Sequence, residues 1–247
     1  MKPKLLLLHG FTGSPRSWDA VVTELGERFD VSAPALTGHV EQSGANVDSF
    51  AGEVERLRRI LDGAAHVTLA GYSLGARLGL GLLLSAPERF ASALLVGVNP
   101  GLSDESERAE RRRADARWSA LLRERGLAAF NEAWAAQPLF ESQRAVEPDL
   151  LEQQRRERMG HDATGLARAL ELFSLGRMPD FWPRLSELGL PITLAAGELD
   201  QKFLDIARRA VVELPLGRLL IAPSAGHNLP LERPDLLARS ILEGQRT

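Results

Sequence analysis

The chain has 247 residues, 44% of them hydrophobic, which is enough for one large α/β domain with an insertion, two small domains being the alternative. The formal net charge of -3 and pI near 6.0 provide no positive field, so we expect binding to neither nucleic acid nor a membrane. Cysteine is absent, which excludes disulfides, thiolate metal sites and a cysteine nucleophile.

The histidine spacing and the N-terminal segment narrow the class further. The five histidines show no close pairing of the H-E-x-x-H type, and we expect neither a metal ion nor an organic cofactor. The apolar run at residues 5–8 holds four leucines, too few for a signal-peptide core or a membrane span. We therefore expect a soluble cytoplasmic protein that is monomeric or forms a small homo-oligomer.

The first part of the chain alternates short apolar runs with helical patterns. Such a βαβαβαβ order predicts a parallel sheet. The second predicted helix has apolar positions at helical spacing, and we expect Asp48 to cap it. The predicted strands are 4–8, 29–33, 66–70 and 91–98, and the predicted helices are 17–28, one that begins at 48, and 74–87.

The pattern changes after residue 98, where strand-like runs give way to long charged helices. These are predicted at 104–125, 126–136, 149–159 and 163–175. The alternation then returns, with strands at 191–196 and 218–222 and helices at 202–214 and 233–244. We interpret 1–98 and 190–247 as two parts of one α/β core, and 99–189 as a helical lid inserted over the carboxyl ends of the strands.

A G-x-S-x-G turn, Gly71 to Gly75, joins the third predicted strand to an apolar helix. Strand before and helix after are typical of a nucleophile elbow, although glycine and serine also mark ordinary turns. The elbow would hold the Ser73 hydroxyl out of the sheet, with the positive end of a helix dipole behind it. We expect the backbone N–H groups of Phe11 and Leu74 to form an oxyanion hole beside it.

An active serine needs a base in reach and an acid to orient that base. Asp200 follows the fifth predicted strand and His227 follows the sixth, and the carboxyl ends of parallel strands converge. His227 would accept the proton of Ser73, while Asp200 would fix the tautomer of His227. The alternatives are a helix cap for Asp200 and a solvated loop position for His227. Another histidine, His9, is expected to brace its loop by hydrogen bonding.

Arginines at cavity-facing positions indicate an anionic small-molecule substrate. Arg77 lies four residues after the serine on the same helix face, so its guanidinium can reach the cavity above the hydroxyl, unless it pairs with a core carboxylate. In the lid, Arg111 falls on the apolar stripe of its helix, and Arg158 lies similarly beside Leu151 and Gln154. Trp134 is either lid core or a ligand contact.

Taken together, these motifs resemble the α/β-hydrolase superfamily throughout the chain. Within it the chain resembles the 2-succinyl-6-hydroxy-2,4-cyclohexadiene-1-carboxylate synthase family of menaquinone biosynthesis. The elbow that ends in arginine, the arginine-rich lid segment and the Gly-Glu-x-Asp-x-Lys-Phe run are the most specific of the shared segments. These segments are 8–13, 71–77, 100–102, 110–115, 137–140, 197–203 and 225–228, together with Trp134 and Arg158.

The resemblance implies a lyase that removes pyruvate from 2-succinyl-5-enolpyruvyl-6-hydroxy-3-cyclohexene-1-carboxylate. Ser73, activated by the acid and the histidine, would abstract a ring proton, and no acyl-enzyme would form. The carboxylates would meet the three arginines, with Trp134 and Tyr72 also in contact. The chain departs from the family's pattern in that it starts directly at the strand before the oxyanion loop, so we expect a sheet of about six strands without the fold's opening antiparallel strands.

Two other interpretations stay open. The triad could make Ser73 a nucleophile in an esterase or carbon–carbon bond hydrolase. Alternatively, the chain could be a ligand-binding protein that retains a hydrolase fold without turnover.

Overall fold

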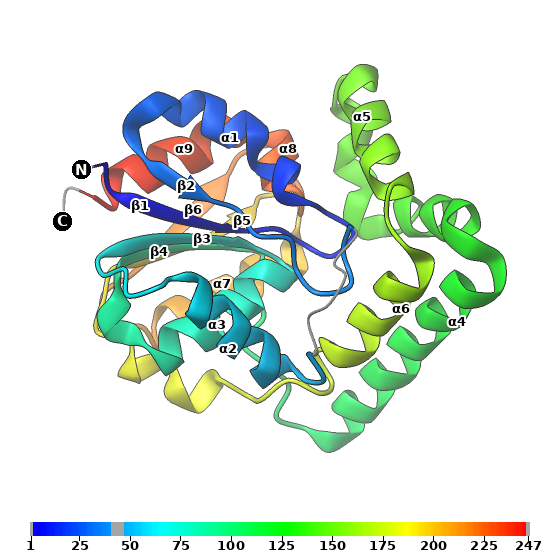
Figure 1. The fold of residues 1–247 in the computed structure, drawn as a ribbon, viewed down its shortest axis with the longest axis horizontal. Coiled ribbons are helices and arrows are strands. Elements are labelled where there is room, and N and C mark those ends of the chain that lie inside the picture. The colour runs from blue at the N-terminus through cyan, green and yellow to red at the C-terminus, as the bar shows by residue number, and fades with distance from the viewer. Residues whose placement is uncertain (1, 41–46, 246–247) are drawn as a thin grey trace.

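The computed structural model describes residues 2–40 and 47–245, in which six strands form one sheet (Figure 1). The strand order is β2-β1-β3-β4-β5-β6, and every neighbouring pair in this sheet is parallel. The predicted α/β sheet of about six strands is therefore confirmed. The strands are β1 (Lys4–Leu8), β2 (Asp30–Ser32), β3 (Val67–Tyr72), β4 (Phe90–Val96), β5 (Ile192–Gly197) and β6 (Gly217–Ala222).

Helices cover both faces of the sheet, with α1, α8 and α9 on one face and α2, α3 and α7 on the other (Figure 1). Successive side chains of a strand point to opposite faces. In β1, Leu5 and Leu7 pack toward α1 and α9, whereas Leu6 and Leu8 pack toward α2 and α3. Burial on both faces explains why β1 is an unbroken leucine run. The helices are α1 (Asp19–Leu25), α2 (Phe50–Ile60), α3 (Leu74–Ser85), α7 (Gln201–Val211), α8 (Leu229–Glu232) and α9 (Pro234–Glu243).

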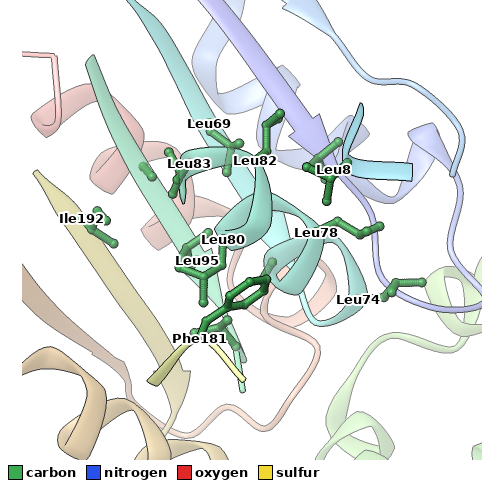
Figure 2. Close-up of a cluster of buried hydrophobic side chains, with 14 of the residues drawn as sticks. Leu8, Leu69, Leu74, Leu78, Leu80, Leu82, Leu83, Leu95, Phe181 and Ile192 are labelled. Carbon is green, nitrogen blue, oxygen red and sulfur yellow. The ribbon is translucent and has the colours of Figure 1, made fainter. Parts of the chain in front are cut away.

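The helix after the elbow, α3, is apolar around most of its circumference, with Arg77 its one charged residue, and lies buried against the sheet. Its leucines, among them Leu78, Leu80 and Leu83, lie in one cluster with Leu69 of β3 and Leu95 of β4 (Figure 2). A helix that is hydrophobic all round is stable only when it is enclosed. The enclosure fixes the first turn of α3 relative to the strand ends.

The segment between β4 and β5 is helical, and its three α-helices stand beside the core in Figure 1. The longest, α4, is broken at Gly126, whose φ of 74° is non-helical, at the predicted junction between two helices. Over residues 2–40 and 47–245 no helix is both long and apolar enough to cross a membrane. The elements are α4 (Glu105–Ala135), the 3₁₀ helix η4 (Pro138–Ala145), α5 (Pro148–Met159) and α6 (Ala163–Leu172).

Several predicted boundaries are corrected by local hydrogen bonding. Ser49, not Asp48, caps α2, because the Ser49 hydroxyl accepts the Gly52 N–H at 3.1 Å. The Asp48 carboxylate instead accepts the Ser49 hydroxyl at 3.0 Å. The predicted helix 17–28 is a shorter α1 flanked by 3₁₀ turns, η1 (Pro15–Trp18) and η2 (Gly26–Arg28). Two further 3₁₀ turns are η3 (Pro87–Arg89) and η5 (Trp182–Glu187).

The corrected cap gives a stability prediction. We expect Ser49→Ala to lower the free energy of unfolding by about 1 kcal/mol, because the Gly52 N–H loses its acceptor. Asp48→Ala should cost less, since its carboxylate holds only the hydroxyl. Urea unfolding of the two variants checks this, and a larger loss for Asp48→Ala would contradict the assignment of the cap.

Candidate active site

The elbow places Ser73 in a backbone conformation that is strained for a residue with a side chain. Its φ is 51° and its ψ is -105°, outside the regions that non-glycine residues favour. The strand and the helix approach closely here, because a Cβ on Gly71 would lie 2.7 Å from the Gly75 carbonyl oxygen. A Cβ on Gly75 would overlap the backbone of Leu8 in β1. Glycines at both positions therefore let α3 begin directly above the strand end, with Ser73 at the tip.

The structure brings Ser73, Asp200 and His227 together from three strand ends. His227 Nδ1 donates to Asp200 Oδ2 at 2.7 Å, and His227 Nε2 lies 3.2 Å from Ser73 Oγ. Both the histidine and the aspartate are buried, at 3% and 7% exposure. Asp200 also caps α7, since its Oδ1 accepts the Phe203 N–H at 3.3 Å. The helix-cap alternative and the orienting role are thus compatible.

This hydrogen-bond pattern fixes what the histidine can do. A carboxylate only accepts, so the proton lies on Nδ1 and leaves Nε2 as the acceptor for the serine hydroxyl. The Phe203 ring packs on the imidazole with 4.3 Å between ring centroids, which restrains its orientation. The arrangement can take the Ser73 proton and hold the imidazolium that results.

Ser73 and His227 open onto a cavity of about 780 Å³ between the strand ends and the helical segment. Both predicted oxyanion donors, Phe11 and Leu74, line it. Leu74 is the first residue of α3, so its N–H has no acceptor within the helix and sits at the positive end of the helix dipole. The two residues that carry the predicted donors thus lie beside the serine at the cavity wall.

Arg77 lines the same cavity as Ser73, as its helical spacing predicts. Its Nη1 donates to the Phe173 carbonyl oxygen at 2.6 Å. Within the described part of the chain it forms no ion pair with a carboxylate. Burial, and after it the neighbouring Arg111 guanidinium, lower the pKa of Arg77. An anion entering this cavity would meet a cation that the fold leaves without a direct counter-charge.

Arg111 also lines the cavity. It is held there by Asp115, a residue that the sequence did not point to. The Arg111 Nε donates to both carboxylate oxygens of Asp115, at 2.9 and 3.0 Å. The Asp115 side chain is buried and borders the cavity as well. The i,i+4 spacing of the two residues on α4 was the available signal.

Tyr72 and Arg158 lie outside the residues that line the Ser73 cavity. They share a smaller cavity of about 260 Å³, which Phe11 also borders. Arg158 comes from α5, and its guanidinium carbon lies 5.6 Å from the centre of the Phe140 ring. Burial lowers the pKa of Arg158 and raises that of Tyr72. Arg158 also lines a third cavity, of about 810 Å³, together with Phe140. The predicted binding residues are therefore distributed over three cavities, of which the Ser73 cavity and the Tyr72 cavity share Phe11.

Trp134 packs in the core of the helical segment and also borders the Ser73 cavity. Its ring stacks on Phe130 at 5.3 Å within the hydrophobic cluster of the helical segment. It also lines the Ser73 cavity, and among the described residues its buried indole N–H has no hydrogen-bond partner. A buried donor without an acceptor is costly, so a ligand acceptor in this cavity would relieve that cost.

His9 braces the loop that follows β1, as predicted. Its Nε2 accepts the Leu36 N–H at 3.0 Å and its Nδ1 donates to the Gly10 carbonyl at 2.8 Å. Two histidines that the sequence left without a role, His39 and His161, are buried against the same loop. Over the described ranges no group of three or more histidine, aspartate or glutamate side chains is arranged to hold a metal ion.

Residues 5–240 match the model of the alpha/beta hydrolase family, and the chain belongs to that family. It is an enzyme of the α/β-hydrolase fold, which confirms that part of the sequence prediction.

Its relatives are more specific. The chain is 33% identical, over 97% of its length and 89% of the relative, to the putative 2-succinyl-6-hydroxy-2,4-cyclohexadiene-1-carboxylate synthase of Bacillus subtilis (strain 168). It is 34% identical, over 94% and 89%, to the synthase of that name from Citrobacter koseri. The solved structure of MenH from S. aureus superposes with a TM-score of 0.93 at 29% identity, covering 99% of this chain and 93% of that one. The predicted resemblance is confirmed.

The buried histidine beside the elbow predicts a pH-dependent stability. Burial lowers the pKa of His9 from 6.5 to about 4, so between these values the unfolded chain binds a proton that the folded chain does not. The free energy of unfolding is therefore unaffected by this group above pH 6.5. As the pH falls toward 4, it decreases by up to about 3 kcal/mol, because protonation of His9 favours the unfolded chain. We expect His9→Gln, which keeps an acceptor for Leu36, to lose less stability than the unmodified protein between pH 7 and pH 5. Urea midpoints measure this, and equal losses would contradict it.

Proposed function

We propose that the protein eliminates pyruvate from 2-succinyl-5-enolpyruvyl-6-hydroxy-3-cyclohexene-1-carboxylate to give 2-succinyl-6-hydroxy-2,4-cyclohexadiene-1-carboxylate, a step of menaquinone biosynthesis. The observation that carries the proposal is one cavity in which Ser73 and His227 face two guanidinium groups, those of Arg77 and Arg111. Full-length similarity to proteins named as this synthase supports it.

The chemistry of substrate and product indicates which proton must leave. The substrate has one ring double bond, at position 3, and the product is a 2,4-diene. Loss of the proton at ring carbon 2 forms the 2,3 double bond, moves the ring π pair to the 4,5 position and breaks the bond to the enolpyruvyl oxygen. The departing enolpyruvate gains a proton on its terminal carbon and becomes pyruvate. Since carbon 2 carries the succinyl carbonyl, the developing charge spreads onto that oxygen.

Each part of the site has a role in this scheme. His227 takes the hydroxyl proton of Ser73, and Ser73 Oγ accepts the proton from the ring. Asp200 stabilises the imidazolium. The backbone N–H groups of Phe11 and Leu74 donate to the succinyl oxygen as it becomes negative, which stabilises the transition state more than the ground state.

The three carboxylates of the substrate call for cations. Arg77 and Arg111 are placed to meet the carboxylates nearest the reacting carbon, because they share the cavity with Ser73. Arg158 is 8% exposed, has no ion pair among the described residues, and borders the adjoining cavity with Tyr72. We assign this pair to the carboxylate farthest from the serine.

A second function keeps the same triad. The 3.2 Å contact between Ser73 Oγ and His227 Nε2 serves nucleophilic attack as well as proton abstraction. An esterase or carbon–carbon bond hydrolase acting on a carboxylated small molecule would use Ser73 in that way and pass through an acyl-serine.

Replacing Ser73 tests the proposed elimination. We expect the unmodified protein to release pyruvate from the substrate, and Ser73→Ala to lower the rate by about 1,000-fold or more, because the base is lost. Ser85→Ala, at the far end of the same helix, is the matched control and should keep the rate. A coupled lactate dehydrogenase assay measures release. If the unmodified protein released no pyruvate, the proposal would be refuted. A burst of p-nitrophenol from a short p-nitrophenyl ester, together with a trapped acyl-serine, would support the hydrolase.

Replacing Arg77 tests the anion site. We expect Arg77→Ala to lower kcat/KM for the tricarboxylate substrate about 100-fold, because a buried charge-assisted contact is lost. Hydrolysis of a neutral p-nitrophenyl ester should change less than tenfold. Arg113→Ala, an exposed arginine on α4, is the control for overall charge. Equal losses on both substrates would make Arg77 a structural residue.

A further inference from the structure

Thr12, next to the predicted oxyanion donor Phe11, is held at both of its backbone polar groups by histidine side chains. Its N–H donates to His39 Nε2 at 3.2 Å, and its carbonyl oxygen accepts from His161 Nε2 at 3.0 Å. Thr12 is 3% exposed and has a φ of 63°, in the left-handed region that β-branched residues rarely adopt. Without outside contacts, this conformation would cost about 1–3 kcal/mol.

The loop around Thr12 is a tight turn, closed by a hydrogen bond from the Gly13 N–H to the Gly10 carbonyl at 3.0 Å. Thr12 occupies the third position of this turn, where a positive φ usually requires glycine or asparagine. The Gly10 carbonyl also accepts from His9 Nδ1. That carbonyl belongs to the same planar peptide group as the Phe11 N–H, which must point the opposite way. Whatever fixes this turn therefore fixes the direction of the Phe11 donor.

His39 and His161 reach the turn from two different parts of the fold. His39 lies in the loop after β2, and His161 lies between α5 and α6. His161 Nδ1 accepts the Val40 N–H at 2.9 Å, so its ring proton is on Nε2, which is the nitrogen that donates to Thr12. The two rings pack edge to face, with 5.7 Å between centroids. Each ring therefore has a defined tautomer and a defined partner.

The electrostatic surroundings keep these rings neutral. Burial lowers the pKa of both His39 and His161, and the nearby Arg158 guanidinium adds to the effect on His161. A neutral His39 can accept the Thr12 N–H, whereas an imidazolium has only donors. A neutral His161 can accept from Val40 and donate to Thr12 at the same time.

We propose that His39 and His161 are positioning residues that hold Thr12 in its left-handed conformation and thereby aim the Phe11 N–H at the oxygen that becomes negative in the reaction. The inference rests on the proposed function for the role of that N–H. Because His161 belongs to the segment between β4 and β5, the same contact ties that segment to the oxyanion turn. Neither histidine touches the substrate in this scheme.

Two substitutions at His161 separate its two hydrogen bonds. Glutamine places an amide N–H where Nε2 lies and keeps the bond to the Thr12 carbonyl, but loses the acceptor for Val40. Asparagine places its oxygen where Nδ1 lies and keeps the Val40 bond, but loses Thr12. For the unmodified protein and both variants, we would measure kcat and KM for pyruvate release. Mass spectrometry would follow amide hydrogen exchange in residues 10–13, and thermal unfolding would verify the fold.

We expect H161N to lower kcat about tenfold and to leave KM within twofold. The Phe11 N–H would be misaligned, and its hydrogen bond matters most in the transition state, where the negative charge develops. Exchange in residues 10–13 should quicken by tenfold or more. H161Q should keep kcat within threefold and keep the slow exchange. Equal effects of the two variants, or a larger effect of H161Q, would overturn the proposal. If the substitutions acted only through a general loss of stability, kcat would fall in both variants in proportion to the fall in melting temperature, which would also overturn the proposal.

The same logic applies from the other side of Thr12. H39Q keeps an acceptor at the Nε2 position for the Thr12 N–H, while H39N does not, so H39N should show the faster exchange and the lower kcat. If the unmodified protein released no pyruvate, the proposed function would fail on its own. The exchange difference between the paired variants would still decide whether the histidines hold the turn.

Discussion

The close contact between the first turn of α3 and the end of β1 is the constraint on which the site depends. Gly75 packs against the backbone of Leu8, and Gly71 allows the chain to reverse within that space. The strain at Ser73 costs about 1–3 kcal/mol. Burial of the α3 leucines offsets it, since each contributes about 1.5–3 kcal/mol. Because the helix cannot shift, the serine tip and Arg77 one turn later keep fixed directions.

The sheet core and the meeting of Ser73, Asp200 and His227 could be predicted because their signals are local. The central strands are short apolar runs, and Asp200 and His227 lie in the loops that follow β5 and β6, so a parallel sheet alone brings them near Ser73. The side chains of the helical segment between β4 and β5 could not be placed in the same way. Periodicity assigns Arg158 to a face of α5, but which cavity that face meets depends on η4 and Phe140, whose position only tertiary packing determines.

The charges around the cavity are unevenly balanced, and this has consequences for affinity. Asp115 neutralises Arg111 directly, whereas Arg77 forms no ion pair among the described residues and donates only to uncharged acceptors, the Phe173 carbonyl oxygen and Met178 Sδ. Keeping a guanidinium buried without a direct counter-charge is unfavourable in the empty protein. A carboxylate that enters the cavity would pair with this guanidinium and remove that cost. Part of its binding free energy would therefore come from the electrostatic cost already present in the empty protein.

The three histidines near the turn at residues 10–13 form hydrogen bonds to it that no local sequence signal reveals. His39 and His161 lie 27 and 149 residues from Thr12, so nothing in the local pattern links them to it. An imidazole with one fixed proton presents an acceptor and a donor on opposite sides of a rigid ring. His161 uses both, which joins two loops through one side chain. A flexible amide offers the same groups without the rigidity, and that difference explains why buried histidine suits a turn whose direction must not vary.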